Sequence, residues 1–452
     1  MKKIVALVGL AALSILPTSA SSLSDLAASP SKPWAASLTL RGFYDDNVLG
    51  TRHGERDVFG IEASPNIALS WSLPQTSLAF NYTYSIKYYD RKPDPSRSEH
   101  YDQTHSFNAL FDHRFSERYH LSINDSFVIG QEPDLLRAGT TYATFQRLSG
   151  DNIRNYGAIN FDAQLTPQLG LQVGYNNAFY HYDDEGGAFD PETATINTTN
   201  KHGTHEGPSN SGRLDRIENT AHIDARWTVL PTTVAIIGYQ YGWTDFTSDE
   251  PVDVNGVVGE FFDDANPTFK SEIRNSRSHY FYVGADHTFR PDLTGSIRVG
   301  GRFIDFYKSP NKESGVSPYA MASLKYAYRF QSYVEAGFSY NRNVSDLIYG
   351  SLVNNSLTTD AETAALWVTV NHAITPKLIG SVMGQFQNST YNGGDFDNET
   401  ERFYTIGFNL AYRFNPHFST EVGYNFDKLD SDSNIGRSFD RNRVYIGGTA
   451  SW

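Results

Sequence analysis

From about residue 35 to its end, the chain alternates apolar side chains with polar or very small ones. In the segment 418–427, for example, Phe418, Val422 and Phe426 fall on one face of an extended strand, whereas Glu421 falls on the other. A strand gives this period of two when its faces meet different surroundings. Because the pattern recurs along nearly the whole chain, it predicts an all-β fold, a transmembrane antiparallel up-and-down β-barrel.

Very short links alternate with longer hydrophilic links between these segments. The short links run from an apolar or aromatic residue into a tight turn that is polar or contains proline. They lie at residues 73–76, 115–118, 165–168, 230–233, 290–292, 329–332, 374–377 and 414–417. With a first strand near 37–45 and a last near 439–452, these hairpins predict about 18 strands.

The two longest links lie at about residues 183–214 and 248–272. Short turns on one side and long loops on the other are typical of bacterial outer-membrane barrels, whose long loops are extracellular. An even number of strands then places both termini in the periplasm. A soluble β-sandwich is the alternative, but it would not separate the loop lengths so regularly.

One phase of each strand is apolar and predicts the lipid-facing surface. It is represented by Phe59, Ile61, Ala63, Ile67, Leu69 and Trp71, and by Ala235, Ile237, Tyr239, Tyr241 and Trp243. The other phase is polar or small, as a water-filled lumen requires. Asp125 and His287 fall in the apolar phase, so each either lies near a membrane interface or marks a register slip at a β-bulge.

The beginning of the chain has the features of a secretory signal peptide. Lys2 and Lys3 precede an apolar run at residues 4–16, which small residues follow up to Ala20. As an uncleaved anchor the run would be too short for the ~30 Å hydrocarbon core. We therefore expect a signal peptide at 1–20, a short segment at 21–34 and the barrel at 35–452.

Composition agrees with a membrane barrel and excludes several kinds of chemistry. Aromatic residues make up 14% of the chain, which suits a lipid-facing band with interfacial girdles. The absence of cysteine excludes disulfides, thiol catalysis and cysteine-bound metals. The net charge of -14 argues against a nucleic-acid partner. No catalytic, phosphate-binding or zinc motif is found, so we expect no enzyme activity, cofactor or metal.

Charged residues in the inward phase are the candidate functional groups, because opposed charges in a pore order water and sort solutes. The pore-lining candidates are His222, Asp224, Asp286, Arg298, Arg302, Glu421 and Arg443. Asp286 and Arg298 flank one short turn, so we expect them to be diagonal neighbours on adjacent strands. Alternatively, these charges pair with one another and only hold the inner wall together.

The last strand carries a further candidate signal. Val444, Ile446 and Ala450 share a phase with the terminal Trp452. Outer-membrane barrels commonly end in such a strand, so Trp452 is the predicted assembly signal for the barrel assembly machinery.

Three short segments carry a resemblance to a known family. They are Tyr44-Asp45-Asp46-Asn47, residues 64–69 (Ser-Pro-Asn-Ile-Ala-Leu) and residues 439–447 at the start of the last strand. With these segments the chain resembles the putative beta-barrel porin type 2 family of Gram-negative outer-membrane proteins.

The resemblance implies a porin-like channel in outer-membrane lipids for passive diffusion of small hydrophilic solutes. Since related barrels accompany exopolysaccharide export, the alternative is an accessory barrel of an exopolysaccharide or capsule secretion system, with polysaccharide as a partner. Inward aromatic residues that could stack on sugar rings favour that alternative; they are Phe43, Tyr280, Tyr282 and Tyr445.

Overall fold

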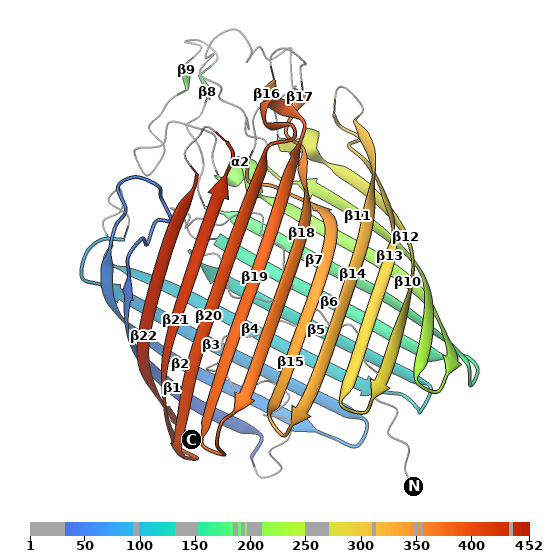
Figure 1. Ribbon diagram of the computed structural model, residues 1–452, viewed down its shortest axis with the longest axis horizontal. Coiled ribbons are helices and arrows are strands. Elements are labelled where there is room, and N and C mark those ends of the chain that lie inside the picture. The colour runs from blue at the N-terminus through green and yellow to red at the C-terminus, as the bar shows by residue number, and fades with distance from the viewer. Residues whose placement is uncertain are drawn as a thin grey trace.

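In the computed structural model of the protein, the described residues form a closed antiparallel barrel (Figure 1). They are residues 32–93, 99–131, 152–183, 189–190, 195–196, 210–248, 271–309, 313–347, 350–351, 356–433 and 437–452. One sheet has 18 strands, and pairing of the first with the last closes it. The predicted fold and strand number are confirmed.

The barrel strands follow one another around the wall in chain order. They are β1 (Trp34–Asp45), β2 (Val58–Ser72), β3 (Thr76–Tyr89), β4 (Tyr101–Arg114), β5 (Tyr119–Gly130), β6 (Asn152–Gln164), β7 (Leu169–Tyr182), β10 (Arg216–Leu230), β11 (Thr233–Phe246), β12 (Ser276–Arg290), β13 (Leu293–Asp305), β14 (Ser314–Arg329), β15 (Ser332–Asn343), β18 (Asp360–Ala373), β19 (Leu378–Asn392), β20 (Thr400–Asn415), β21 (Phe418–Ser431) and β22 (Phe439–Ser451).

The predicted short turns all join neighbouring strands at one end of the barrel, where β1 begins and β22 ends (Figure 1). The opposite end carries the long links and the small elements within them. These elements are β8 (Phe189–Asp190), β9 (Thr195–Ile196), α2 (Asn210–Leu214), η2 (Ser271–Arg274), β16 (Gly350–Ser351), β17 (Ser356–Leu357) and η3 (Gly394–Phe396). The predicted alternation of short and long links is therefore confirmed. The expected signal peptide lies outside the described residues.

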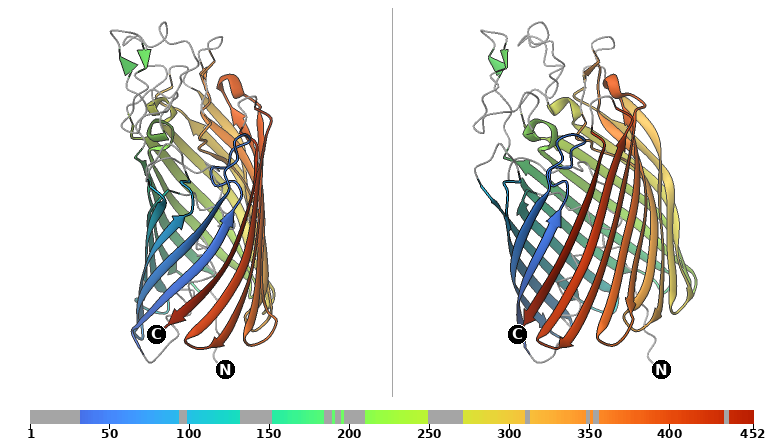
Figure 2. Two further views of the ribbon diagram at one scale, coloured as in Figure 1. Left: turned by 90° about the vertical axis from the view of Figure 1, so that its left-hand side faces the viewer. Right: turned by 60° about the vertical axis from the view of Figure 1, so that its left-hand side comes forward.

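The barrel is oval in cross-section, since it is wide in Figure 1 and much narrower after a turn of 90° in Figure 2. Strands β18–β22 form the wall nearest the viewer in Figure 1, and β3–β6 run behind them. Two broad walls thus face each other across the lumen.

The two faces of the wall separate as the alternation predicts. On β13, the side chains of Ile297, Val299 and Phe303 point outward and are exposed, whereas Arg298 and Arg302 point inward and are buried. Such a wall presents apolar groups to lipid and polar groups to the lumen.

Of the two outward polar residues, His287 lies at the end of the wall, whereas Asp125 lies in the middle of a strand. His287 lies beside the 230–233 turn, where its Nδ1 is 2.8 Å from Thr233 Oγ1, so it sits at the end of the wall as one prediction had it. Asp125 is in the middle of β5, and its pairing with β4 and β6 continues without a register shift. Neither the interface nor a bulge accounts for Asp125.

The barrel closes through residues that carried the family resemblance. Arg441 on β22 donates from Nε to Asp45 Oδ2 at 3.0 Å, and both side chains are buried. The Asp46 carboxylate accepts from the backbone and side-chain nitrogens of Asn442 at 2.6 and 2.7 Å. Asn47 Nδ2 donates to the Asp440 carbonyl at 2.9 Å. The segments at 44–47 and 439–447, far apart in sequence, therefore contact each other at the long-loop end of the closing seam.

Candidate permeation path

The inner wall of β10, β12 and β13 carries a triad of charges. Asp286 lies 2.8 Å from Arg298 Nη1 and 2.7 Å from Arg226 Nη2. The predicted diagonal contact between Asp286 and Arg298 is therefore confirmed, while Arg226 was not among the candidates. One carboxylate between two guanidinium groups leaves this triad with one excess positive charge.

Asp224 and His222 lie on β10, on the same inner face as this triad. Tyr282 donates its hydroxyl to Asp224 Oδ1 at 2.6 Å. The His222 ring lies across Gly174 of β7, where an added Cβ would come within 2.1 Å of the imidazole. Glycine at this position thus leaves room for the ring against the wall.

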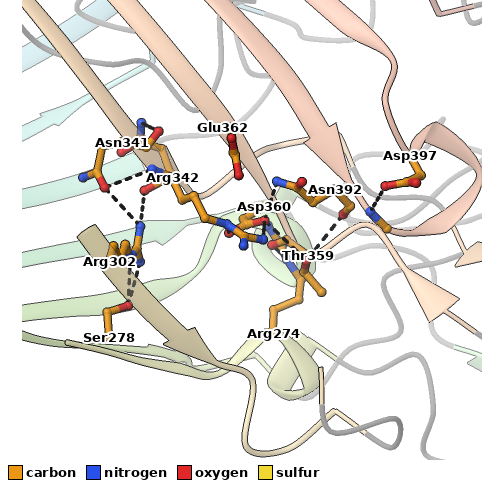
Figure 3. Close-up of polar contacts among 12 residues, drawn as sticks. Arg274, Ser278, Arg302, Asn341, Arg342, Thr359, Asp360, Glu362, Asn392 and Asp397 are labelled. Atoms are coloured by element: carbon orange, nitrogen blue, oxygen red, sulfur yellow. Dashed lines mark hydrogen bonds and ion pairs between the residues drawn. The ribbon is translucent and has the colours of Figure 1, made fainter. Parts of the chain in front are cut away.

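Arg302 is held by uncharged groups. Its Nε and Nη2 donate to Ser278 Oγ at 3.0 and 2.8 Å, and Nη1 donates to the Arg342 carbonyl. Its guanidinium lies 5.0 Å from the centre of the Tyr280 ring (Figure 3 shows Arg302 and Ser278). Among the described residues, the contacts of Arg302 are with uncharged groups and none is with a carboxylate, so no direct partner offsets its positive charge.

A second charged cluster crosses the closing seam. Glu421 on β21 lies 2.6 Å from Arg41 Nη2 of β1, although β22 runs between these strands. Gly447 of β22 is the residue between them, and an added Cβ there would come within 2.6 Å of Arg41 Cγ. Arg41 therefore reaches across a glycine to its partner.

This charged cluster continues on the other side of Arg41, toward β2 and β3. Glu62 on β2 pairs in register with Arg41 and lies 3.6 Å from its Nη1, and Lys87 on β3 pairs in register with Glu62. Nearer the long loops, Arg443 of β22 forms an ion pair with Asp427 of β21. Acidic and basic side chains thus interleave around this part of the inner wall.

At the long-loop end of the barrel, several links contact the segment 344–347, which follows β15. Arg274 of η2 donates to the carbonyls of Ser345, Thr359 and Arg213 at 2.6, 3.3 and 2.9 Å (Figure 3 shows Arg274 and Thr359). Burial, together with the nearby charge of Arg216, lowers the pKa of Arg274. Its three carbonyl acceptors nevertheless favour the protonated form, which can donate to all of them.

The segment 344–347 is also held from the opposite direction. Arg437, which precedes β22, donates to Asp346 Oδ1 at 2.9 Å and lies 3.1 Å from Glu401 Oε1. Leu347 packs with Ala361, Tyr391 and Phe396 in a small apolar cluster. The link between β11 and β12 and the link between β21 and β22 therefore both contact this segment at the long-loop end.

The predicted pore-lining residues lie on the inner face, but the structure distributes them over two clusters. His222, Asp224, Asp286, Arg298 and Arg302 lie on β10, β12 and β13, whereas Glu421 and Arg443 lie on β21 and β22. The described residues hold no group of three or more histidine, cysteine or acidic side chains arranged to bind a metal. In the same part of the chain, no helix is both long and apolar enough to cross a membrane.

Comparison with known proteins gives one family match. Residues 361–451 match the family described as "Putative beta-barrel porin 2". The resemblance is confirmed for this region. It spans most of β18 to β22 and contains the segment 439–447, whereas 44–47 and 64–69 lie outside it. The match and the closed barrel point to the outer membrane.

No curated protein matches the chain. The outer membrane protein OpdK from Pseudomonas aeruginosa is 12% identical, with a TM-score of 0.39, over 93% of this chain and 99% of that chain. OccAB4 from Acinetobacter baumannii is 12% identical with a TM-score of 0.42 at the same coverage. The siderophore receptor PirA from Acinetobacter baumannii is 7% identical with a TM-score of 0.45, over 93% of this chain and 81% of that chain.

Proposed function

We propose that the protein is an outer-membrane porin-like channel for passive diffusion of small hydrophilic solutes. The observation that carries this function is the interleaving of acidic and basic side chains along the inner wall of a closed barrel with an apolar outer surface. A wall of this kind suits water and polar solutes, whereas a dry core would need large apolar groups. The function requires no cofactor and no covalent chemistry.

Planar bilayers containing the purified protein test this proposal. We expect discrete conductance steps in salt, and liposomes with the protein should swell in small sugars. Protein that is folded by heat-modifiable migration, yet gives neither steps nor swelling, would contradict it.

The alternative, an accessory barrel for exopolysaccharide or capsule export, depends on sugar-stacking aromatic residues. Tyr280 and Tyr282 pack against Tyr319, with ring centroids 5.3 and 5.6 Å apart, and Tyr445 lies under Arg41. The rings of these three tyrosines therefore already pack against other side chains of the protein. Swelling in long oligosaccharides at the same rate as in small sugars would favour the alternative.

We further propose that both termini are periplasmic, that residues 1–20 are removed after Ala20, and that Trp452 is read by the barrel assembly machinery. Trp452 is exposed on the outer surface and exchanges backbone hydrogen bonds with Ala36. N-terminal sequencing of the membrane form tests the cleavage site.

Replacing Trp452 with Asp should reduce the folded yield in the outer membrane, because the last strand would lose its terminal aromatic group. Heat-modifiable migration on a gel measures the yield. Val229→Asp near the 230–233 turn is the control, since it also places a carboxylate at an outward position near the short-turn end. Equal losses for both variants would mean that Trp452 has no special role.

A further inference from the structure

Four consecutive strands carry a polar residue in the outward phase. We call Asp125, Asn155, Asn177 and Asn219, on β5, β6, β7 and β10, the lateral polar belt. Backbone pairing runs from Asp125 to Gly157, from Gly157 to Asn177 and from Asn177 to Asn219, so most of the belt follows one row.

Asp125 and Asn155 of the belt lie within the apolar band. Ile123 and Phe127 flank Asp125 in the outward phase of β5, and Ile153 and Ile159 lie on either side of Asn155 along β6. Asp125 is the seventh of the 12 residues of β5. A strand rising ~3.3 Å per residue at a tilt of about 40° places it roughly 15 Å from Tyr119 along the membrane normal. That depth is near the middle of a band about 25 Å tall.

The belt residues form hydrogen bonds along the outer surface. Asn155 Nδ2 donates to Asp125 Oδ1 at 3.0 Å. Tyr175 and Asn177 both donate to Asn219 Oδ1, at 2.6 and 2.8 Å. A carboxylate has about four lone-pair sites, so one amide satisfies only part of its capacity. Lipid chains offer no donor for the rest.

The wall on the other side of the barrel differs at the same level. The outward residues in the middle of β20, β21 and β22 are apolar, aromatic or glycine; they are Ile406, Phe408, Leu410, Val422, Tyr424, Val444, Ile446 and Gly448. The polar belt is therefore a feature of one wall and not of the lipid-facing surface as a whole.

Residues beside the belt have small side chains. Ala109 pairs in register with Asp125 on one side and Gly157 on the other, and Ala221 follows Asn219 in the outward phase of β10. Small residues let two membrane-embedded surfaces approach closely enough for polar groups to bond across the contact.

We propose that the lateral polar belt is the contact surface between two copies of this chain, related by a two-fold axis along the membrane normal. The occupant must be embedded at the same depth and must offer donors to Asp125. The belt of a second copy meets both conditions, because it places carboxamide donors beside carboxylate and carboxamide acceptors. A two-fold contact brings the same patch of both subunits together, so a patch that carries donors and acceptors is complementary to itself. The proposal rests on the membrane setting and not on solute transport.

Cross-linking tests the position of this contact, and the absence of native cysteine makes single-cysteine variants specific. Gly157→Cys lies within the belt, where its Cβ would be 3.5 Å from Asp125 Oδ1, an ordinary contact. Val444→Cys on β22 is the control, since it is also outward and exposed. Outer membranes treated with a short bis-maleimide should give a covalent dimer of the first variant only. No dimer, equal dimer from both variants, or cross-linking of Gly157→Cys to a different protein would overturn the proposal.

Oligomeric state tests the role of the polar groups. In detergent, native mass spectrometry should detect a dimer of the wild type. Asp125→Leu with Asn177→Leu should lower the dimeric fraction about tenfold, because the contact loses its hydrogen bonds. Heat-modifiable migration should show that the barrel remains folded, as leucine suits a lipid-facing position. A monomeric wild type, or a folded variant that stays dimeric, would contradict the proposal, and either result would leave the channel function untouched.

Discussion

At the scale of single residues, a glycine allows two charged side chains on non-adjacent strands to form an ion pair inside this barrel. Arg41 reaches Glu421 only because Gly447, the residue between them on β22, has no side chain. An added Cβ would lie 2.6 Å from Arg41 Cγ and 2.8 Å from the Leu40 carbonyl. The contact between β1 and β21 therefore depends on a residue that takes no part in it.

Gly447→Ala should lower the free energy of unfolding by about 1–3 kcal/mol, because the methyl group overpacks the wall beside Arg41. Urea unfolding in lipid vesicles measures the loss. Gly42→Ala is the matched control: Gly42 lies one residue along β1 in the outward phase, and nothing lies within 4 Å of an added Cβ. Similar values for the two variants would show that the Arg41 side chain moves aside at no cost.

The sequence predicted which charged residues face inward, but only part of their pairing. Asp286 and Arg298 flank one short turn, so the local hairpin register was enough to predict their contact. Arg41 and Glu421 are separated by almost the whole chain, and their contact exists only once β1 meets β22. Period-two alternation carries no information on that register.

At the scale of elements, polar side-chain contacts stabilise the closing seam between β1 and β22. Asp45 and Arg441 are both buried, and the neighbouring Asp46 bonds to Asn442. In the sequence, the segments 44–47 and 439–447 were recognised only because they resemble a known family. That they contact each other follows only from closure of the barrel.

Asp45→Ala should lower the free energy of unfolding by about 3–5 kcal/mol, because it removes the carboxylate that forms a buried ion pair with Arg441. Arg402→Ala removes the exposed Arg402–Asp432 pair and should cost about 0–1 kcal/mol. Urea unfolding in vesicles measures both. The double variant Asp45→Ala, Arg441→Ala should recover part of the loss, since it also removes the buried guanidinium that lost this carboxylate. A loss for Asp45→Ala no larger than for Arg402→Ala would mean that the seam is held by its backbone pairing alone.

At the scale of the whole molecule, turn length gives the barrel two different ends. The short turns at one end allow no further structure, whereas the links at the other end carry α2, η2 and η3 and converge on the segment 344–347. The alternation of link lengths predicted this polarity from the sequence. It could not predict the convergence, because Arg274 and Arg437 approach the segment from distant parts of the chain.

Labelling of single cysteines on intact cells should distinguish the two ends. His53→Cys lies in the exposed link between β1 and β2, and Pro231→Cys lies in an exposed short turn. An impermeant maleimide should label the first variant only, because the short turns face the periplasm. Both should react after the cells are permeabilised, which controls for reactivity. The reverse pattern on intact cells would contradict periplasmic termini.

The distribution of charge along the lumen sets the expected ion preference. Asp286 offsets one of the two positive charges of Arg226 and Arg298, and Arg302 on the neighbouring strand has uncharged partners. Asp286→Asn leaves the two arginines uncompensated, so reversal potentials under a salt gradient should shift toward anion preference. Asp440→Asn is the control, because it makes the same change in net charge at an outward, exposed position of β22. Equal shifts for the two variants would mean that overall charge sets the preference. No shift for Asp286→Asn would place the permeating ions away from this wall.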